Sequence, residues 1–263
     1  MNLNVEHLSF SYGKRPILQD VCFTAAPGEF LSVLGPNGVG KSTLFRCILG
    51  ILTDYSGRIT VDDTDLRSLS RQQQAKRIAY IPQIHRPTFG YTVLDTVLMG
   101  TTRQVSLFSQ PSAKQIEQAH AALQQLGVGE LADRNFSHLS GGEQQLVLVA
   151  RAIVQQADIL IMDEPTSALD YGNQLRVLQK VKQLADDGYS VLLSTHNPQH
   201  AMSFATRILA LAGGQVAAFG TPDEVLTTDL VRRLYGVEVS FVETAQGRLL
   251  APQMNLETQG VIP

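Results

Sequence analysis

The sequence predicts an α/β protein with a parallel sheet, antiparallel strands at its N-terminal end and a helical segment inserted in the middle. Short apolar runs at 30–34, 159–162 and 190–194 are typical of buried strands, and helical patterns separate them. Between about 92 and 156 one helical pattern follows another. Strands that alternate with helices favour a parallel sheet, so we interpret the helical stretch as an insertion.

Composition and charge are those of an ordinary globular protein. The 263 residues are 44% hydrophobic and 17% charged, with a net charge of −3 and no run of Lys or Arg. A basic patch marks nucleic-acid binding, so no nucleic-acid partner is expected. There is no secretory signal and no uninterrupted apolar stretch of about 18 residues, the length of a spanning helix. We therefore expect a cytosolic chain that reaches a membrane only through a partner.

The elements can be followed in order along the chain. Residues 3–10 alternate loosely, turn signals follow, and the run at 30–34 leads through a Gly-rich turn into a helical pattern at 42–49. Cys22 and Cys47 lack the spacing of a metal site and are too few for a disulfide framework. Both cysteines are expected to be buried small hydrophobic residues.

Helices are expected at 92–99, 113–126 and 140–156 in the inserted segment. Two short strands within 206–219 flank a Gly-Gly turn, residues 222–235 have a helical pattern, and 237–251 is typical of a hairpin that turns near Gly247.

These elements predict a single domain over residues 1–252. Its α/β core would comprise about 1–86 and 157–252, and its helical subdomain about 87–156. Residues 253–263 would form a disordered tail.

A phosphate-binding motif follows the first buried strand. Residues 35–42, Gly-Pro-Asn-Gly-Val-Gly-Lys-Ser, match G-x-x-x-x-G-K-[ST] between a strand and a helix. Glycines let backbone N–H groups approach phosphate oxygens, and the helix N-terminus favours the same anion. Lys41 would reach the β and γ phosphates, and Ser42 would offer a hydroxyl to Mg²⁺. The candidate nucleotide-binding residues here are Gly35, Asn37, Gly38, Gly40, Lys41, Ser42 and Thr43.

Acidic residues and a histidine follow the other two buried strands. Asp163 and Glu164 come after 159–162, at the edge of an open sheet where ligands bind, and His196 follows 190–194. Alone, the acids are more typical of a solvated turn and the histidine of a satisfied core or surface group. Beside a phosphate motif we expect Asp163 to assist Mg²⁺, Glu164 to orient or deprotonate water, and His196 to hydrogen-bond a γ-phosphate.

Residues 139–143, Leu-Ser-Gly-Gly-Glu, open a helix with an apolar stripe. Ser140 and Glu143 could form a capping box and nothing more. Two glycines after a cap are costly to a helix start unless something approaches the backbone, and a phosphate would do so.

Together these segments resemble the ABC ATPases, because the cradle at 35–43, LSGGE at 139–143, ILIMDE at 159–164 and His196 occur in the usual order of that family. The resemblance covers about residues 1–250 and implies a P-loop NTPase (RecA-like) core that hydrolyses ATP with Mg²⁺.

The resemblance also implies roles that spacing alone does not show. Tyr12 matches the aromatic residue that stacks on adenine, and Gln83 the glutamine that contacts Mg²⁺ and links the nucleotide to a membrane partner. Residues 167–170, which end in Asp170, match a loop that crosses the dimer interface. Two copies would pack head to tail, so that Ser140, Gly141 and Gly142 of one subunit touch the γ-phosphate held by Lys41 of the other.

Two positions depart from the family pattern: Glu143 stands where Gln is commoner, and Leu146 where many relatives have Arg. Glu143 brings negative charge towards a phosphate. If it bends back to the Ser140 N–H, as a capping box predicts, the repulsion is reduced and activity is retained.

Residues 91–100 and 233–252 resemble importer subunits that handle ferric siderophores, haem, cobalamin and sometimes molybdate. A second capping box, Thr92 with Asp95, precedes a stripe of apolar residues that is typical of an ordinary core-facing helix. Alternatively, the aromatic residues Phe89 and Tyr91 before it would suit docking of a partner's helix. With 67 residues after His196, we expect no appended regulatory domain of the kind that sugar-importer ATPases carry. The expected partners are two polytopic permease subunits and an extracytoplasmic solute-binding protein, with the ATPase homodimer peripheral at the cytoplasmic face.

The alternative is a soluble ABC ATPase that serves iron–sulfur assembly. A chromosome or DNA-repair ATPase would need long heptad segments, which are absent from the sequence.

Overall fold

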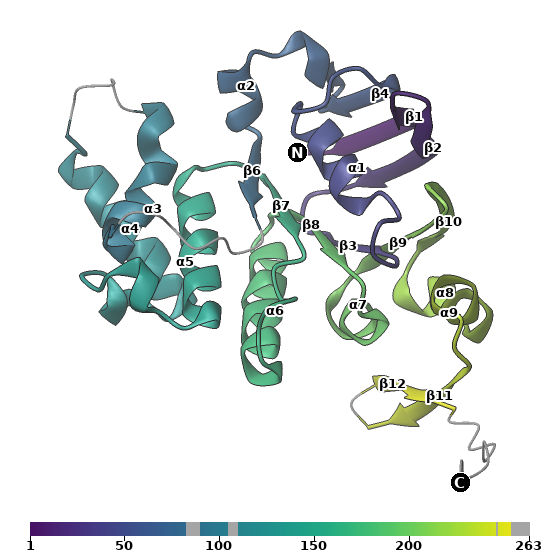
Figure 1. Cartoon of the computed structure of the whole chain (residues 1–263). Helices are drawn as coiled ribbons and strands as arrows, with labels where there is room; N and C mark the ends of the chain where they lie inside the picture. The colour runs from purple at the N-terminus through teal and green to yellow at the C-terminus, as the bar shows by residue number, and fades with distance from the viewer. Residues whose placement is uncertain (83–89, 105–109, 246, 254–263) are drawn as a thin grey trace, which may run out of the picture.

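The computed structural model describes residues 1–82, 90–104, 110–245 and 247–253 (Figure 1). The predicted contacts of Gln83 and Phe89 lie outside these ranges. Of the tail predicted to be disordered, 253–263, only Gln253 is described, and its N–H donates to the carbonyl oxygen of Glu238 at 2.9 Å. Among the described residues, none of the helices has both the length and the apolar character needed to cross a membrane.

The central sheet confirms the predicted α/β class. In the described ranges its order is β10-β9-β3-β8-β7-β6, and only the edge strand β10 pairs antiparallel with its neighbour. Its strands are β3 (Phe30–Leu34), β6 (Ile78–Ile81), β7 (Ile159–Asp163), β8 (Ser190–Thr195), β9 (Arg207–Ala212) and β10 (Gln215–Gly220). Both faces are covered, so β3 and β8 are buried along their whole length, as parallel strands in such sheets are.

A second, antiparallel sheet lies beside the core with the order β2-β1-β4-β5 (Figure 1). Its strands are β1 (Leu3–Tyr12), β2 (Arg15–Ala25), β4 (Ser56–Val61) and β5 (Thr64–Asp65). Its inner side chains share one apolar cluster with α1 (Lys41–Ile48) and with Ile159 and Ile161 of β7. A short connection through η1 (Leu66–Ser68) and α2 (Arg71–Ala75) returns the chain to β6.

The prediction that both cysteines are buried is wrong for Cys22. Cys47 is buried in α1, whereas Cys22 is exposed on β2. Side chains alternate along a strand, and its neighbours Val21 and Phe23 occupy the inner face, so Cys22 points to solvent.

The inserted segment is helical. Its elements are α3 (Val93–Leu98), η2 (Met99–Gln104), α4 (Ala113–Leu126), η3 (Gly129–Leu131), η4 (Phe136–His138) and α5 (Gly141–Val154). Both predicted capping boxes are confirmed, at Thr92 with Asp95 and at Ser140 with Glu143.

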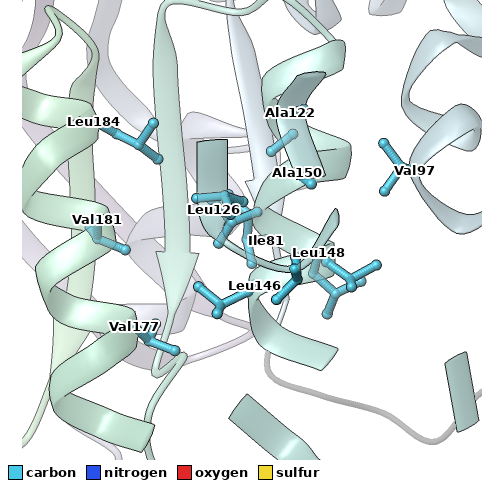
Figure 2. Close-up of a cluster of buried hydrophobic side chains, with 14 of the residues drawn as sticks. Ile81, Val97, Ala122, Leu126, Leu146, Leu148, Ala150, Val177, Val181 and Leu184 are labelled. Carbon is cyan, nitrogen blue, oxygen red and sulfur yellow. The ribbon is translucent and has the colours of Figure 1, made fainter. Parts of the chain in front are cut away.

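The helical segment and one face of the central sheet share a single apolar core. Leu126, Val97 and Ala150 of the segment lie in the same cluster as Ile81 of the sheet and the buried stripe of α6 (Tyr171–Asp186) (Figure 2). Burial of each Val, Leu or Ile side chain in this core is worth about 1.5–3 kcal/mol. Since successive residues of β7 alternate between this core and the one beneath the antiparallel sheet, the strand links both halves of the molecule.

The C-terminal part packs on the sheet from the central strands β3 and β8 to the edge strand β10, next to α6. It contains α7 (Pro198–Phe204), α8 (Pro222–Val225), α9 (Thr228–Tyr235), β11 (Val239–Thr244) and β12 (Gly247–Pro252). The helix predicted over 222–235 is divided, because the Thr227 hydroxyl caps a new helix by accepting from Leu230 N. The predicted hairpin is confirmed. The N–H of Leu250 donates to Gln199 Oε1 of α7 at 2.9 Å, which ties the hairpin to the helix that follows His196.

Candidate functional site

The site lies where the parallel strands β3, β7 and β8 end. Leu34 pairs with Thr195, and Asp163 pairs with Ser194, so these three strands finish at the same edge of the sheet. Ligands of open α/β sheets bind at this edge. The motifs that are far apart in the sequence therefore meet in space.

The Gly-rich turn connects β3 to the first turn of α1. Gly38 and Gly40 have φ of +80° and +113°, a region that favours glycine. At Gly35 a Cβ would stand 2.7 Å from the carbonyl oxygen of Leu211, so a larger residue does not fit. Gly40 caps α1 without a side chain, which leaves the N–H groups of the helix start to the loop.

Lys41 is the first residue of α1 and folds back over the turn. Its Nζ donates to the carbonyl oxygens of Gly35 at 2.8 Å and Pro36 at 3.1 Å, and it lies 3.1 Å from Glu164 Oε1. Its side chain is only 5% exposed. A buried ammonium group needs such partners, because an unpaired buried charge is costly. The cation is thus held rigidly beside the loop.

Glu164 adopts a left-handed conformation, with φ of +46°. Its Oε2 lies 3.2 Å from His196 Nδ1, while Oε1 faces Lys41. A carboxylate with a cation on one oxygen and an imidazole on the other is fixed in orientation. Strained backbone of this kind costs about 1–3 kcal/mol and persists where the surroundings hold it.

Ser194 holds this turn and is a residue that the sequence analysis missed. The Ser194 hydroxyl donates to Asp163 Oδ1 at 2.7 Å and accepts from the Glu164 N–H at 2.9 Å. It therefore fixes both acids at once. Its position two residues before His196, at the carboxyl end of a buried strand, was the available signal.

Other predicted residues lie at the start of two neighbouring helices. Ser140 caps α5, and Asp170 caps α6 by accepting from Asn173 N at 2.9 Å. This bond holds the pKa of Asp170 below its usual value. Gly142 leaves no room for a Cβ, which would stand 2.7 Å from Asn173 Cγ. Close packing within the chain is thus a sufficient reason for that glycine.

Glu143 bends back as the capping box requires. Its Oε2 accepts from the Ser140 N–H at 2.8 Å and from the Ser140 hydroxyl at 2.7 Å. These hydrogen bonds, with the side-chain bond as the larger cause, hold the pKa of Glu143 below its usual value. The carboxylate is therefore ionised, with its charge directed at its own helix start.

The structure brings the phosphate loop and Lys41 together with Asp163, Glu164 and His196. In the described part of the chain, the ion pairs of Lys41 and Glu164 involve neither Tyr12 nor residues 140–142. Tyr12 ends β1, half-exposed and edge-on to Phe10 at 4.9 Å between ring centroids. Ser42 is exposed in the first turn of α1, and Gln83 lies outside the described residues.

The hydroxyl of Ser42 and the carboxylate of Asp163 are hard oxygen donors of the kind that Mg²⁺ prefers, so the residues present fit this cation. The arrangement of phosphate loop, cation and fixed carboxylate can bind a nucleotide and direct a water molecule.

The ABC transporter family model matches residues 18–167. The hemin import ATP-binding protein of Bordetella pertussis is 40% identical over 261 residues, which cover 95% of this chain and 98% of that protein. A manganese transport system ATP-binding protein of Bacillus subtilis is 34% identical, with 92% of this chain and 95% of that protein covered.

Among solved structures, an inward-facing conformation of a metal-chelate type ABC transporter is similar with a TM-score of 0.84. That likeness has 33% identity and covers 96% of this chain and 98% of the other.

Proposed function

The chain belongs to the ABC transporter family of ATP-binding subunits, which couple ATP hydrolysis to transport, and from this premise we propose that it powers the import of a metal chelate or an oxyanion. The observation that carries the proposal is the likeness to the metal-chelate type transporter over nearly the whole of both chains. Haem, ferric siderophores and cobalamin are the favoured solutes, followed by molybdate. An ATP-binding subunit of this kind would sit at the cytoplasmic face of the membrane.

The nucleotide would bind across the edge of the sheet. The backbone of residues 35–43 and the Lys41 ammonium would hold the phosphates, and Tyr12 would stack on the adenine. Mg²⁺ would be held by Ser42, Asp163 and Gln83, and it would neutralise charge on the β and γ phosphates.

Glu164 is the proposed general base. Its carboxylate orients a water that attacks the γ-phosphorus, and accepts the proton of that water as the bond to the β–γ bridging oxygen breaks and ADP leaves. His196, 3.2 Å from Glu164, would hydrogen-bond the γ-phosphate. A phosphate that draws Lys41 to itself would release Oε1 of Glu164 for this work, since the two groups form an ion pair at 3.1 Å.

Two copies would form a head-to-tail dimer with shared sites. Ser140, Gly141 and Gly142 start α5 and would present N–H groups to the γ-phosphate held by Lys41 of the partner subunit. The charge of Glu143 is directed at the Ser140 N–H and hydroxyl, which reduces its repulsion of that phosphate. Asp170 would lie in the loop that crosses the interface.

The membrane partner would dock in a groove between α1 and the helical segment. This groove of about 410 Å³ is lined by Ile51, Tyr80, Met99 and Arg151 among others. Burial lowers the pKa of the Arg151 guanidinium, which makes no hydrogen bond or ion pair with the described residues. The apolar side chains would cover a short helix of the permease, and Arg151 would meet a carboxylate or a helix C-terminus on it.

Co-purification tests the proposal. The chain, tagged and expressed at native level in its own cells, is expected to bring down a polytopic membrane permease, and through it an extracytoplasmic solute-binding protein. Membrane vesicles that hold this complex should take up the solute only with hydrolysable ATP. A stable complex with soluble iron–sulfur scaffold proteins, and none with a permease, would overturn the importer proposal.

A further inference from the structure

Three potential metal ligands gather on the outer face of the antiparallel sheet, away from the nucleotide site. They are His7 of β1 and Asp20 and Cys22 of β2, and all three are exposed. His7 Nδ1 lies 2.7 Å from Asp20 Oδ1 and 3.7 Å from Cys22 Sγ. Their ligand atoms all fall within 4.8 Å of one another.

Two bulges in paired strands bring these side chains to one point. Val5 pairs with Phe23 and Leu8 with Val21, so Glu6 and His7 together oppose Cys22. The next shift lies between the pairs Leu8–Val21 and Phe10–Leu18 and leaves Asp20 in an irregular stretch. A bulge re-aims a side chain, and both shifts here turn a ligand towards Cys22.

His7 and Asp20 both have left-handed backbones, with φ of +50° and +54°. The Asp20 N–H donates to the Ser9 hydroxyl of the paired strand at 2.8 Å, which fixes the second bulge. The backbone of Gly57 on β4 packs so closely against His7 that a Cβ there would overlap the His7 carbonyl oxygen, which confines the first. The convergence is therefore a fixed feature of the sheet.

The geometry distinguishes a metal site from a nucleophile. A catalytic Cys–His–Asp group uses the two imidazole nitrogens separately, one for the thiol and one for the acid. Here both Asp20 and Cys22 approach the same atom, His7 Nδ1. Three ligand atoms that gather at one point, each with a lone pair, can surround a single cation.

We propose that His7, Asp20 and Cys22 form a binding site for Zn²⁺ or a similar borderline divalent cation, with water at the fourth position. Zinc bonds to nitrogen, oxygen and sulfur are about 2.0–2.3 Å long, so neighbouring tetrahedral ligands stand roughly 3.3–3.7 Å apart. The separation of Cys22 and His7 already has this value, and Asp20 needs to withdraw by only about half an ångström. A thiolate, an imidazole and a carboxylate together select zinc over Mg²⁺ or Ca²⁺.

A backbone donor supports the thiolate. The N–H of His7 donates to Cys22 Sγ at 3.1 Å, and such bonds stabilise a negatively charged sulfur. The other thiol does not compete, because burial in α1 raises the pKa of Cys47 to about 12. The site stands independently of the importer proposal, since none of its residues takes part in nucleotide binding.

Zinc binding to the whole metal-stripped, reduced protein tests the site. One equivalent of Zn²⁺ is expected to bind with release of protons and to raise the melting temperature, because the metal binds only the folded sheet. Co²⁺ as a probe should give a thiolate-to-metal charge-transfer band. Free thiol is titrated first, so that both cysteines are known to be reduced.

Variants assign the ligands. Cys22→Ser should abolish the Co²⁺ thiolate band, and His7→Gln and Asp20→Asn should each weaken Zn²⁺ by at least about tenfold, the least that loss of a supporting residue costs. His120→Asn, an exposed histidine on α4, is the matched control and should bind like the parent. All three ligands are exposed, so far-UV circular dichroism and ATP affinity should be unchanged. Absence of stoichiometric Zn²⁺ binding would overturn the site. So would binding that survives when Cys22→Ser, His7→Gln and Asp20→Asn are combined in one variant.

Discussion

Lys41 Nζ lies 3.1 Å from Glu164 Oε1, so the cation of the phosphate loop is paired with the carboxylate proposed to activate water. The pair joins the start of α1 to the end of β7, two segments that are far apart in the sequence. Any ligand that competes for Lys41 thereby changes the surroundings of Glu164.

Glu164→Gln should lower kcat by about 10²–10⁴-fold, because an amide cannot accept a proton from water. ATP affinity should be retained or increased, since the neutral side chain no longer competes with phosphate for Lys41. Phosphate release and equilibrium binding of ATP are the measurements. Glu238→Gln, an exposed glutamate on the C-terminal part, is the control. Undiminished hydrolysis in the Glu164 variant would exclude the general-base role.

Ser194→Ala should both destabilise the protein and slow hydrolysis, because Asp163 loses a donor and the Glu164 N–H loses its acceptor. The unpaired group costs about 1–3 kcal/mol of unfolding free energy, measured by urea denaturation. Ser190→Ala is a matched control on the same strand, where the buried hydroxyl has no partner among the described residues. That variant should be neutral or stabilising. Equal behaviour of the two variants would contradict the role assigned to Ser194.

The shared-site dimer can be tested by complementation. Lys41→Ala and Gly141→Asp homodimers should both be inactive, the first in both phosphate loops and the second in both α5 starts. Mixed together, they form a heterodimer in which one site keeps an intact Lys41 and an intact Gly141. Hydrolysis should therefore reappear on mixing. A mixture that stays inactive while native mass spectrometry shows heterodimers would mean that each site is contained in one subunit.

Ile51→Asp should prevent capture of the permease, because it places a charge in the proposed docking groove. Ile51 is 56% exposed, so folding and the ATPase rate of the isolated subunit should not change. Val242→Asp makes the same kind of change at a similarly exposed aliphatic residue of the C-terminal hairpin. If Val242→Asp abolished the complex and Ile51→Asp retained it, the permease would bind at a surface other than this groove.

The free energy of unfolding should fall in mild acid because of His200, which is buried in α7. Burial, and secondarily the charge of His196, lowers the pKa of His200 below its ordinary value of 6.5. The unfolded chain then binds more protons than the folded one, so this contribution is complete above about pH 6.5 and is lost as the pH falls towards the folded pKa. Melting curves between pH 8 and 5 on His200→Gln should show a weaker pH dependence than the parent. His120→Asn should keep the parent's dependence.

Much of the fold follows from patterns in single segments. The buried strands β3, β7 and β8 were predicted within a residue of their ends, because parallel strands covered on both faces are continuously apolar. The strand β2 was not predicted, since turn-like and polar residues interrupt its alternation and its two bulges break the period. A helical pattern was expected between the strands at 159–162 and 190–194, and α6 lies there, although its ends were not predicted.

In the site, too, residues within a local motif were predicted, whereas residues placed by strand pairing were not. The fixed spacing of the phosphate motif predicts Lys41 directly. The role of Ser194 depends on strand register, and the sequence signals it only through the place of Ser194 at the end of a buried strand. Cys22 illustrates the limit best: its exposure follows from which face of β2 is covered, and its neighbours His7 and Asp20 come from two separate bulges.

The core that the helical segment shares with the central sheet has an evolutionary consequence. The residues that seat α3, α4 and α5 are also those that cover one face of β6, β7 and β8. The insertion is therefore not an independent module, because its removal would expose apolar side chains of β6 that α5 contacts and would open the core shared with α6. Selection can vary its outer surface to suit a new membrane partner, while its inner surface must change in step with the strands beneath it.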